Sequence, residues 1–386
     1  MRIKTCVAIF IILLQLSFLF AEPSLSARSA ILIDSDTKTI LFEKNTSDIL
    51  PAASITKLVT AYIVLDLLDR GEISEGSVTV PEKLAEIPFP PDASLAHLTP
   101  GEKIQLDELL SLLLVYSAND AAYALALIID DSIDAFADRM NALVSSMGYA
   151  DMHFAEPSGL SVQNRISARS MAFFAADYIK RFRYALARYH SIPYVEYRGR
   201  LFYNRNKLLA SYLGMDGLKT GYIEESGFNL VATAERKGLR LISVVLGIFA
   251  PTYWDGLEER DKQSAQLLDW GFSSYIRVEK STIDIRPLRI WGGEITTITP
   301  ILSRPLTATI KKDKLSSLRL EADIEKTYFA PMQNGHILGT ARLTDGERTL
   351  DSCPIISPVS VERGSIWRII ADFFIRLWWQ LTGKLD

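Results

Sequence analysis

The stretch SITKLVTAYIVLDLLD, residues 54–69, predicts a helix at the centre of a folded domain. Gly71 follows shortly after as a stop signal. Apolar side chains lie on nearly all sides of this helix, which is typical of a helix that other elements cover all round. We therefore expect the neighbouring segments to pack around it.

Two β-hairpins flank this region along the chain, at residues 29–45 and 226–247. Each has two apolar strands joined by a polar turn. Between the hairpins, further helical stretches run over residues 106–115 and onward from Asn119. Strands at both ends with helices between them predict an α+β fold, in which an antiparallel or mixed sheet is covered by helices. The pattern is not the βαβ repeat of a doubly wound fold.

The pattern changes after about residue 278. Residues 281–357 contain short segments of alternating hydrophobicity, separated by Gly, Pro, Asp and Asn. Such spacing predicts a small all-β domain that follows the first domain along the chain.

The composition excludes several classes of protein. The 386 residues are 48% hydrophobic, and the mean hydropathy is +0.12. The excess lies at the two ends, because residues 6–21 hold 14 hydrophobic residues in 16 and residues 366–381 hold 12 in 16. Without them the value is about 45%, which is ordinary for a globular protein and excludes a disordered, collagen-like or multi-span membrane protein. A net charge of −4 gives no support for nucleic-acid binding.

The N-terminal segment, residues 1–21, has the pattern of a cleaved export signal. Arg2 and Lys4 precede an apolar run that ends at Ala21 and is short for a membrane span. The alternative is a buried first strand or helix. An export signal would place the protein outside the cytoplasm, and we expect it at the periplasmic face of the cytoplasmic membrane.

The C-terminal segment, residues 362–384, predicts an amphipathic helix that lies in the plane of a membrane surface. Apolar and aromatic residues recur at helical spacing, and Arg368, Asp372 and Arg376 recur on the opposite side. Trp379 falls near the polar side and blurs the pattern, as Ile369 does. The alternative is a terminal helix that packs on the protein's own core.

Cysteine and histidine are scarce. The two cysteines, Cys6 and Cys353, form no disulfide framework, and the four histidines are not at metal-ligand spacing. No G-x-S-x-G motif is present. We expect neither a metal nor a cofactor.

The predicted central helix carries an unusual lysine. Lys57 lies near its start among apolar residues, where burial lowers the pKa of an ammonium group and makes it a candidate general base. Ser54 lies one turn earlier on the same face, at a helix N-terminus where backbone N–H groups are free. This is the layout of an activated serine nucleophile with part of an oxyanion hole. The alternative is an N-cap serine beside a surface lysine.

Two further motifs lie at positions that favour the same site. Ser117-Ala118-Asn119 is a polar turn between two apolar helical stretches, although Asn119 alone could be explained as a helix N-cap. Lys219-Thr220-Gly221 precedes the second hairpin. Gly221 allows a ligand to approach the strand closely, and Lys219 adds positive potential for an anionic group.

Taken together, S-x-x-K, S-x-N and K-T-G resemble the motif set of penicillin-binding proteins and class A β-lactamases. Within that superfamily the chain resembles the low-molecular-mass D-alanyl-D-alanine carboxypeptidases, in segments such as HFAEPSGLSVQNRISARSMA and RDKQSAQLLDWGF. The resemblance implies a β-lactamase/transpeptidase-like catalytic domain over residues 28–278. It also implies a small β-domain at residues 281–357 and a membrane-anchoring helix at residues 362–384.

The resemblance implies a role for each catalytic residue. Ser54 would attack the carbonyl of the D-Ala–D-Ala bond, and Lys57 would accept its proton. Ser117 would pass a proton toward the leaving D-alanine. Asn119 would bind the substrate amide and hold Lys57 in place.

It also implies substrate contacts. Lys219 and Thr220 would hold the region of the terminal carboxylate, and the N–H groups of Ser54 and Tyr222 would form the oxyanion hole. An arginine of the family faces the same carboxylate, and Arg260 lies at the matching place.

Arg205, in the segment NRN, is a second candidate for that arginine. The implied partners are the peptidoglycan stem peptide, β-lactam antibiotics as covalent inhibitors, and a membrane surface. One departure is Ile223, where the family often has a threonine, because isoleucine cannot supply that threonine's side-chain hydrogen bond to the substrate.

Three rival functions share these motifs. A β-lactamase is disfavoured because Glu156-Pro157 is not followed by the Leu-Asn pair of the class A deacylation loop. A DD-endopeptidase that cuts peptidoglycan cross-links has the same sequence motifs as a carboxypeptidase and stays as the alternative. A non-catalytic penicillin-binding scaffold would not need all three motifs intact.

Overall fold

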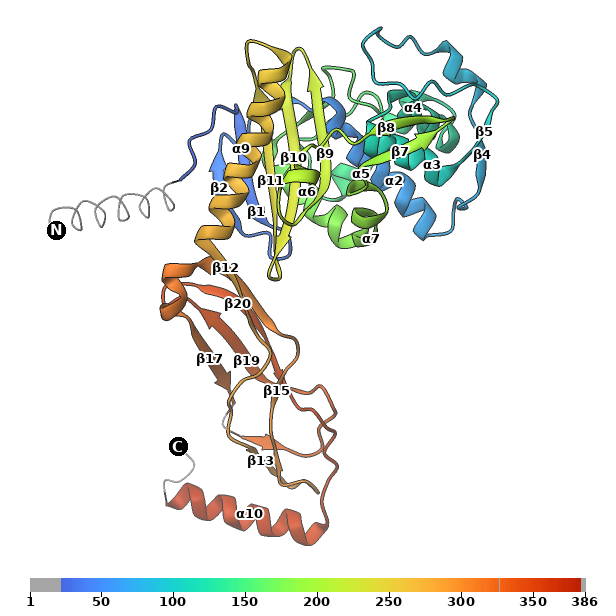
Figure 1. Ribbon diagram of the computed structural model, residues 1–386. Helices are drawn as coiled ribbons and strands as arrows, with labels where there is room; N and C mark the ends of the chain where they lie inside the picture. The colour runs from blue at the N-terminus through green and yellow to red at the C-terminus, as the bar shows by residue number, and fades with distance from the viewer. Residues whose placement is uncertain (1–21, 326, 383–386) are drawn as a thin grey trace, which may run out of the picture. The chain divides into compact units, whose positions relative to one another are not determined.

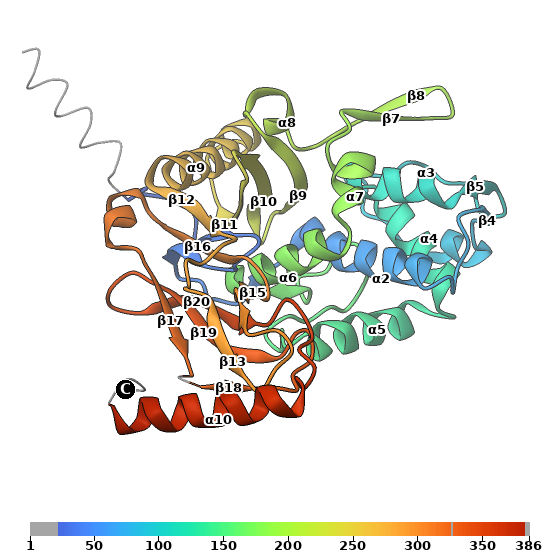
Figure 2. The same ribbon diagram turned by 90° about the horizontal axis from the view of Figure 1, so that it is seen from below.

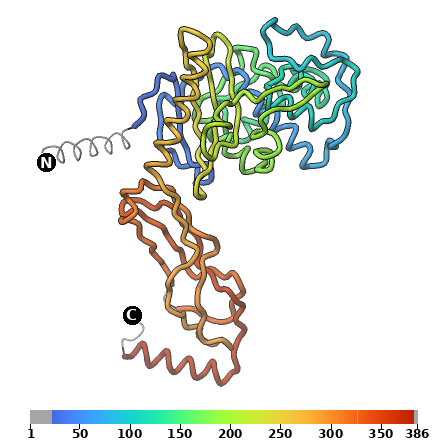
Figure 3. The backbone as a smooth tube through the Cα atoms, in the orientation of Figure 1, coloured from blue at the N-terminus to red at the C-terminus, as the bar shows by residue number. Residues whose placement is uncertain are grey.

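The computed structural model describes residues 22–325 and 327–382, so the predicted export signal lies outside the described residues. The chain divides into two compact units between Ser274 and Tyr275. The backbone of each unit can be followed in Figure 3.

The first unit is built on a five-stranded antiparallel sheet with the strand order β2-β1-β11-β10-β9 (Figure 1). Its strands are β1 (Ser29–Asp34), β2 (Ile40–Lys44), β9 (Met215–Ile223), β10 (Gly227–Arg236) and β11 (Leu239–Ile248). The two predicted hairpins meet in this sheet, because β1 pairs with β11 and Ile31 lies opposite Val244. The predicted α+β architecture is therefore confirmed.

Helices cover both faces of the sheet, as Figure 2 shows. Helix α9 (Tyr253–Ser274) packs on β10 and β11, and helix α6 (Ala168–Arg181) packs on β1 and β11 from the other side. Every residue of β11 is buried as a result. A strand covered on both faces needs a continuous apolar sequence, which LRLISVVLGI nearly supplies.

The predicted central helix is α2 (Lys57–Asp69), and a short 3-10 turn, η1 (Ala53–Thr56), precedes it. Nine of its thirteen residues are buried, which confirms its central place. It packs against helices α4 (Asn119–Ile129) and α5 (Ile133–Ser146).

One predicted helix differs from the structure. Residues 106–115 do not form one continuous helix, because α3 (Leu106–Ser111) passes into a wider π-type turn, η3 (Leu112–Tyr116). This turn ends at Ser117, whose φ of 71° lies in the left-handed region. Wider turns of this kind are frequent at functional sites because they re-aim the residues that follow.

Short elements complete the first unit. They are β3 (Leu50–Pro51), β4 (Ser77–Thr79), η2 (Glu82–Glu86), β5 (Lys103–Gln105), β6 (Arg165–Ile166), α7 (Arg183–Ala185), η4 (Leu186–His190), β7 (Tyr194–Tyr197), β8 (Arg200–Tyr203) and α8 (Leu208–Ser211).

The second unit is rich in β-strands and has an apolar core of its own. Its sheets have the orders β15-β20-β19-β17, β14-β13-β18 and β12-β16. The strands are β12 (Tyr275–Lys280), β13 (Leu288–Trp291), β14 (Thr297–Ile298), β15 (Ile301–Leu302), β16 (Leu306–Lys311), β17 (Arg319–Ile324), β18 (Tyr328–Phe329), β19 (Ile337–Thr344) and β20 (Thr349–Ile356), with one 3-10 turn, η5 (Lys312–Ser317). Cys353 is a free, buried thiol in this core.

The chain's last described helix is α10 (Ile366–Leu381), which begins after the N-cap Ser365. The Ser365 side chain accepts a hydrogen bond from the backbone N–H of Arg368. Within the described part of the chain, neither α10 nor any other helix combines the length and apolar character needed to cross a membrane.

Candidate active site

Ser54 and Lys57 lie together as predicted from their spacing. Lys57 Nζ donates a hydrogen bond to Ser54 Oγ over 2.9 Å. Ser54 is half-buried on η1, whereas Lys57 is fully buried at the start of α2. Burial lowers the pKa of Lys57 to about 7, and the negative charges of Glu156 and Asp120 offset part of this effect. A neutral amine in contact with the hydroxyl can accept its proton near neutral pH.

Two further contacts fix the position of the Lys57 amine. Its Nζ donates to Asn119 Oδ1 over 2.7 Å and to the backbone carbonyl of Ser158 over 2.6 Å. Asn119 is the first residue of α4, and Ser158 lies in the loop before β6. In the neutral form of Lys57 its two N–H bonds are directed to Asn119 and Ser158, which leaves the nitrogen lone pair for the hydroxyl of Ser54.

Ser117 and Lys219 form a second pair in the same site. Lys219 Nζ donates to Ser117 Oγ over 2.8 Å, and both residues are buried. Burial lowers the pKa of Lys219 well below its ordinary value, and the positive charges of Lys57, Arg205 and Arg260 lower it further. A serine with φ of 71° is strained, and strain of this kind concentrates at functional sites.

Strand β9 runs close beside the turn that carries Ser54. A Cβ on Gly221 would lie 3.1 Å from the Ala52 carbonyl oxygen and 3.2 Å from the Ile55 nitrogen, so only glycine allows this approach without a shift. Within the described residues β9 is an edge strand of the five-stranded sheet, and its free edge offers backbone groups to an extended peptide. Thr220 and Tyr222 flank Gly221 on this strand.

Tyr222 is 41% exposed, and its ring lies 4.3 Å from that of Phe228 and 5.2 Å from that of Tyr253. Ile223, the departure from the family pattern, ends β9 at the turn into β10, and its carbonyl accepts from the Ser226 backbone N–H.

The two candidate arginines differ in setting. Arg260, on α9, is 2% exposed, and Asp261 accepts from its Nε and Nη2 over 2.9 and 2.6 Å. Arg205 is exposed, and its guanidinium lies 4.4 Å from the centre of the Tyr116 ring, beside Ser117. Both charges act on Lys219, so the structure brings both arginines to the site.

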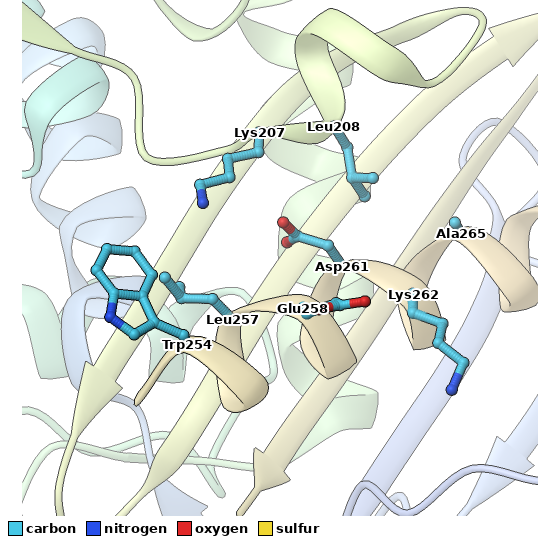
Figure 4. Close-up of a pocket in the computed structure, with 8 residues that line it drawn as sticks. All are labelled: Lys207, Leu208, Trp254, Leu257, Glu258, Asp261, Lys262 and Ala265. Carbon is cyan, nitrogen blue, oxygen red and sulfur yellow. The ribbon is translucent and has the colours of Figure 1, made fainter. Parts of the chain in front are cut away.

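A pocket of about 450 Å³ lies along α9 next to the Arg260–Asp261 pair. Asp261 is one of its walls, together with Lys207, Leu208, Trp254, Leu257, Glu258, Lys262 and Ala265 (Figure 4).

The loop that supports Ser54 was not predicted from the sequence. Gly159 has a φ of +89°, and a Cβ there would lie 1.8 Å from the Ala53 carbonyl oxygen and 2.8 Å from the Ser54 nitrogen. Asn164 ties the same loop to the turn, because its carbonyl accepts from the Ala52 N–H over 2.8 Å. Its Nδ2 also donates to Thr56 Oγ1 over 3.1 Å. Gly159 lies in the segment EPSGL, but its role depends on the close approach of the Ala53 backbone, which the sequence does not reveal.

Glu156 holds this loop together. Its carboxylate accepts from the backbone N–H groups of Ser158 and Gly159 over 2.7 and 2.6 Å, and from Ser158 Oγ over 2.6 Å. The carboxylate oxygens are therefore engaged within the loop, which disfavours the role of a water-activating glutamate in a β-lactamase.

The whole arrangement suits acyl transfer to a serine from a substrate with a terminal carboxylate. Ser54 contacts a buried lysine whose lowered pKa suits a general base, and Ser117 contacts Lys219. The positive charges of Arg205 and Arg260 beside Lys219 attract an anion at the same place.

Comparisons with known proteins place the chain in one family. The chain is 30% identical over 359 residues to the D-alanyl-D-alanine carboxypeptidase DacF of Bacillus subtilis, covering 89% of this chain and 88% of that protein. It is 29% identical to DacC of Escherichia coli, covering 94% of this chain and 91% of the relative. Among solved structures, penicillin-binding protein 5 of Haemophilus influenzae matches with a TM-score of 0.75 and 28% identity, covering 89% of this chain and 99% of that one. The sequence profile of the peptidase S11 family, described as D-alanyl-D-alanine carboxypeptidase, matches residues 17–250, and the chain belongs to this family.

Proposed function

We propose that this chain is a serine-type D-Ala-D-Ala carboxypeptidase that removes the terminal D-alanine from peptidoglycan pentapeptide stems. The observation that carries the proposal is the buried, deprotonable Lys57 in hydrogen-bond contact with Ser54 Oγ. The Ser117–Lys219 pair and the surrounding positive charges supply the other groups that this reaction needs.

Acylation starts with attack of Ser54 Oγ on the carbonyl carbon of the D-Ala–D-Ala bond, as Lys57 takes the hydroxyl proton. The N–H groups of Ser54 and Tyr222 stabilise the oxyanion. Collapse of the tetrahedral intermediate breaks the C–N bond, and the proton taken by Lys57 passes through Ser117 to the nitrogen of the departing D-alanine, so that Lys57 is neutral again. The products are an ester on Ser54 and free D-alanine.

Deacylation uses water as the nucleophile. Lys57 accepts a proton from the water, which attacks the ester carbonyl, and Lys57 then returns this proton to the released Ser54 oxygen. The shortened stem leaves as a carboxylic acid, so the enzyme returns to its starting state.

The charge distribution explains why the enzyme would cleave at the terminal residue of the stem peptide. Arg205 and Arg260, whose charges act on Lys219, supply positive potential for the carboxylate of the leaving D-alanine. A penicillin carries a carboxylate near its reactive amide and would acylate Ser54 in the same way. Its amine stays tethered to the acyl group, so deacylation is slow. A relative of 30% identity, penicillin-binding protein D2 of Listeria monocytogenes, has been solved with cefotaxime bound.

Mass spectrometry of a muramyl pentapeptide after incubation tests the reaction. Loss of one alanine is the expected result, whereas cleavage of cross-linked dimers alone would favour the endopeptidase. Fluorescent penicillin should label the protein, and Ser54→Ala should abolish labelling. Ser145→Ala is the matched control, because Ser145 is an exposed serine on α5. Labelling that survives in Ser54→Ala would overturn the assignment of the nucleophile.

We also propose that residues 1–21 direct export and that α10 holds the protein at the outer surface of the cytoplasmic membrane. The supporting observation for the second part is the large number of exposed apolar and aromatic side chains on α10. Deletion of residues 362–386 should release the protein from membranes and leave penicillin labelling intact. N-terminal sequencing of the mature protein tests the first part, and a retained Met1 would contradict it.

A further inference from the structure

Helix α10 is fixed to the second unit through its polar side. Asp372 is 4% exposed, and its carboxylate accepts from Arg289 Nη2 over 2.7 Å and from the Gly292 N–H over 2.8 Å. Arg368, one turn earlier, lies 3.5 Å from the same carboxylate. These contacts fix the rotation of the helix about its axis.

Aromatic and cation–π contacts also hold the polar side of α10 against the β-strands. The Trp379 ring lies 5.4 Å from that of Trp291, at an angle of 82°. The Arg289 guanidinium lies 4.2 Å from the centre of Trp291 and 5.4 Å from that of Trp379. Trp379, which blurs the amphipathic pattern in the sequence, is therefore explained by packing on the β-strands.

The opposite side of α10 carries exposed apolar side chains, each at least 41% exposed. They are Ile366, Trp367, Ile370, Phe373, Phe374, Leu377, Trp378 and Leu381. A terminal helix of a soluble protein usually packs its apolar side on the core and exposes its polar side. In α10 this arrangement is reversed.

A pocket of about 340 Å³ lies between α10 and the β-strands of this unit. Its walls are Trp291, Gly292, Phe329, Ala330, Arg363, Ile369, Asp372, Phe373 and Arg376. Phe373 belongs both to the pocket and to the exposed apolar side, so the pocket borders that side.

Two positive charges of the pocket have no acidic partner. The Arg376 guanidinium lies 5.0 Å from the centre of the Phe329 ring, and neither Arg376 nor Arg363 forms an ion pair within the described residues. Asp372 is the one carboxylate of the pocket wall. Burial alone would raise the pKa of Asp372, but the Gly292 amide and Arg289 lower it below its usual range. Its charge is thus offset by Arg289 and Arg368, and the pocket keeps a net positive charge.

We propose that this pocket binds the phosphate-bearing headgroup of an anionic phospholipid, with Arg363 and Arg376 as the phosphate ligands. Guanidinium groups match phosphate oxygens in charge and geometry, and the volume is within the range of small-molecule sites. An interfacial helix places its apolar side just below the headgroups. A pocket that borders this side therefore lies at the level of the lipid phosphates. The inference rests on the proposed membrane attachment through α10.

The test measures binding of the full chain to vesicles of phosphatidylcholine alone and of phosphatidylcholine mixed equally with phosphatidylglycerol. We expect Arg363→Gln/Arg376→Gln to bind the mixed vesicles about thirtyfold more weakly, or about 2 kcal/mol, because each basic contact contributes about half of this energy. Arg319→Gln/Arg342→Gln removes the same charge from the β17–β19 sheet and should bind within about threefold of the unmodified chain. Circular dichroism of each variant checks that α10 is retained. Arg363 lies before the start of α10, so Arg363→Gln alone tests the pocket without a change in the helix.

A titration with monomeric dihexanoyl-phosphatidylglycerol separates a headgroup site from general attraction to a charged surface. Saturable binding that is lost in Arg363→Gln/Arg376→Gln supports the pocket, and weaker binding of inorganic phosphate identifies the lipid as the preferred source. An equal loss of vesicle binding in both double variants would overturn the pocket and leave the membrane attachment standing. If the unmodified chain binds neither kind of vesicle, the membrane attachment itself fails.

Discussion

Replacement of Gly159 by alanine should disable the nucleophile without touching a catalytic side chain. The new Cβ would lie 1.8 Å from the Ala53 carbonyl oxygen, and this gap has to open by more than about 1 Å before the contact becomes tolerable. Ala53 precedes Ser54 directly, so the shift passes into the backbone of the nucleophile. Misplacement by about 1 Å costs about a hundredfold in rate, so we expect at least that loss in acylation by penicillin.

The left-handed backbone at Gly159 adds a second effect that has to be separated from the first. An alanine at a φ of +89° costs about 1–2 kcal/mol of stability wherever it is placed. Gly148 is the matched control, because its φ is +87° and a Cβ there meets nothing within 4 Å. Gly148→Ala should therefore lower the midpoint of thermal unfolding and leave acylation unchanged.

The assay is the second-order rate of labelling by fluorescent penicillin, measured at a temperature where both variants are folded. Thermal unfolding followed by circular dichroism supplies the stability of each variant. If Gly159→Ala is labelled within about threefold of the unmodified rate, the close approach of the loop does not position Ser54 and the reasoning fails.

Three further predictions concern the charges of the site. The acylation rate should rise with pH through a midpoint of about 7, because the neutral form of Lys57 is the base and its fraction grows as the pH passes its pKa; a flat profile would contradict this. Asp120→Asn removes a negative charge that raises the pKa of Lys57, so the midpoint should move to lower pH, and an unchanged midpoint would exclude this coupling. Asp261→Asn loosens Arg260 and should raise KM for the pentapeptide about tenfold with little change in kcat, whereas a fall in kcat alone would show that Arg260 acts elsewhere.

The two serine–lysine pairs were predictable because the geometry of one is local and the motif of the other is specific. A three-residue spacing at a helix start places Ser54 and Lys57 one turn apart, and the 2.9 Å contact follows from this. The pairing of Ser117 with Lys219 spans 102 residues and came only from the motif set, since no periodicity relates the two positions.

The supporting loop was not predictable for a physical reason. Lys57 contacts the backbone carbonyl of Ser158. Because every residue has a carbonyl, the sequence alone does not identify this acceptor. The role of Gly159 likewise depends on which backbone approaches it in three dimensions. The wide turn η3 escaped prediction because residues 106–115 have a helical pattern throughout, and the left-handed conformation of Ser117 depends on its place between Lys219 and the helices.

For α10 the sequence predicts which side chains share a face, but it does not say which face packs. The buried Asp372 and its contact with Arg289 decide this, because a carboxylate at 4% exposure is stable only when it is paired. If the apolar face packed on the β-strands instead, Asp372 would lose its partner and Arg289 would lose its place over Trp291. The pairing therefore holds the apolar face outward, and the two interpretations of this helix, docked and membrane-facing, are compatible.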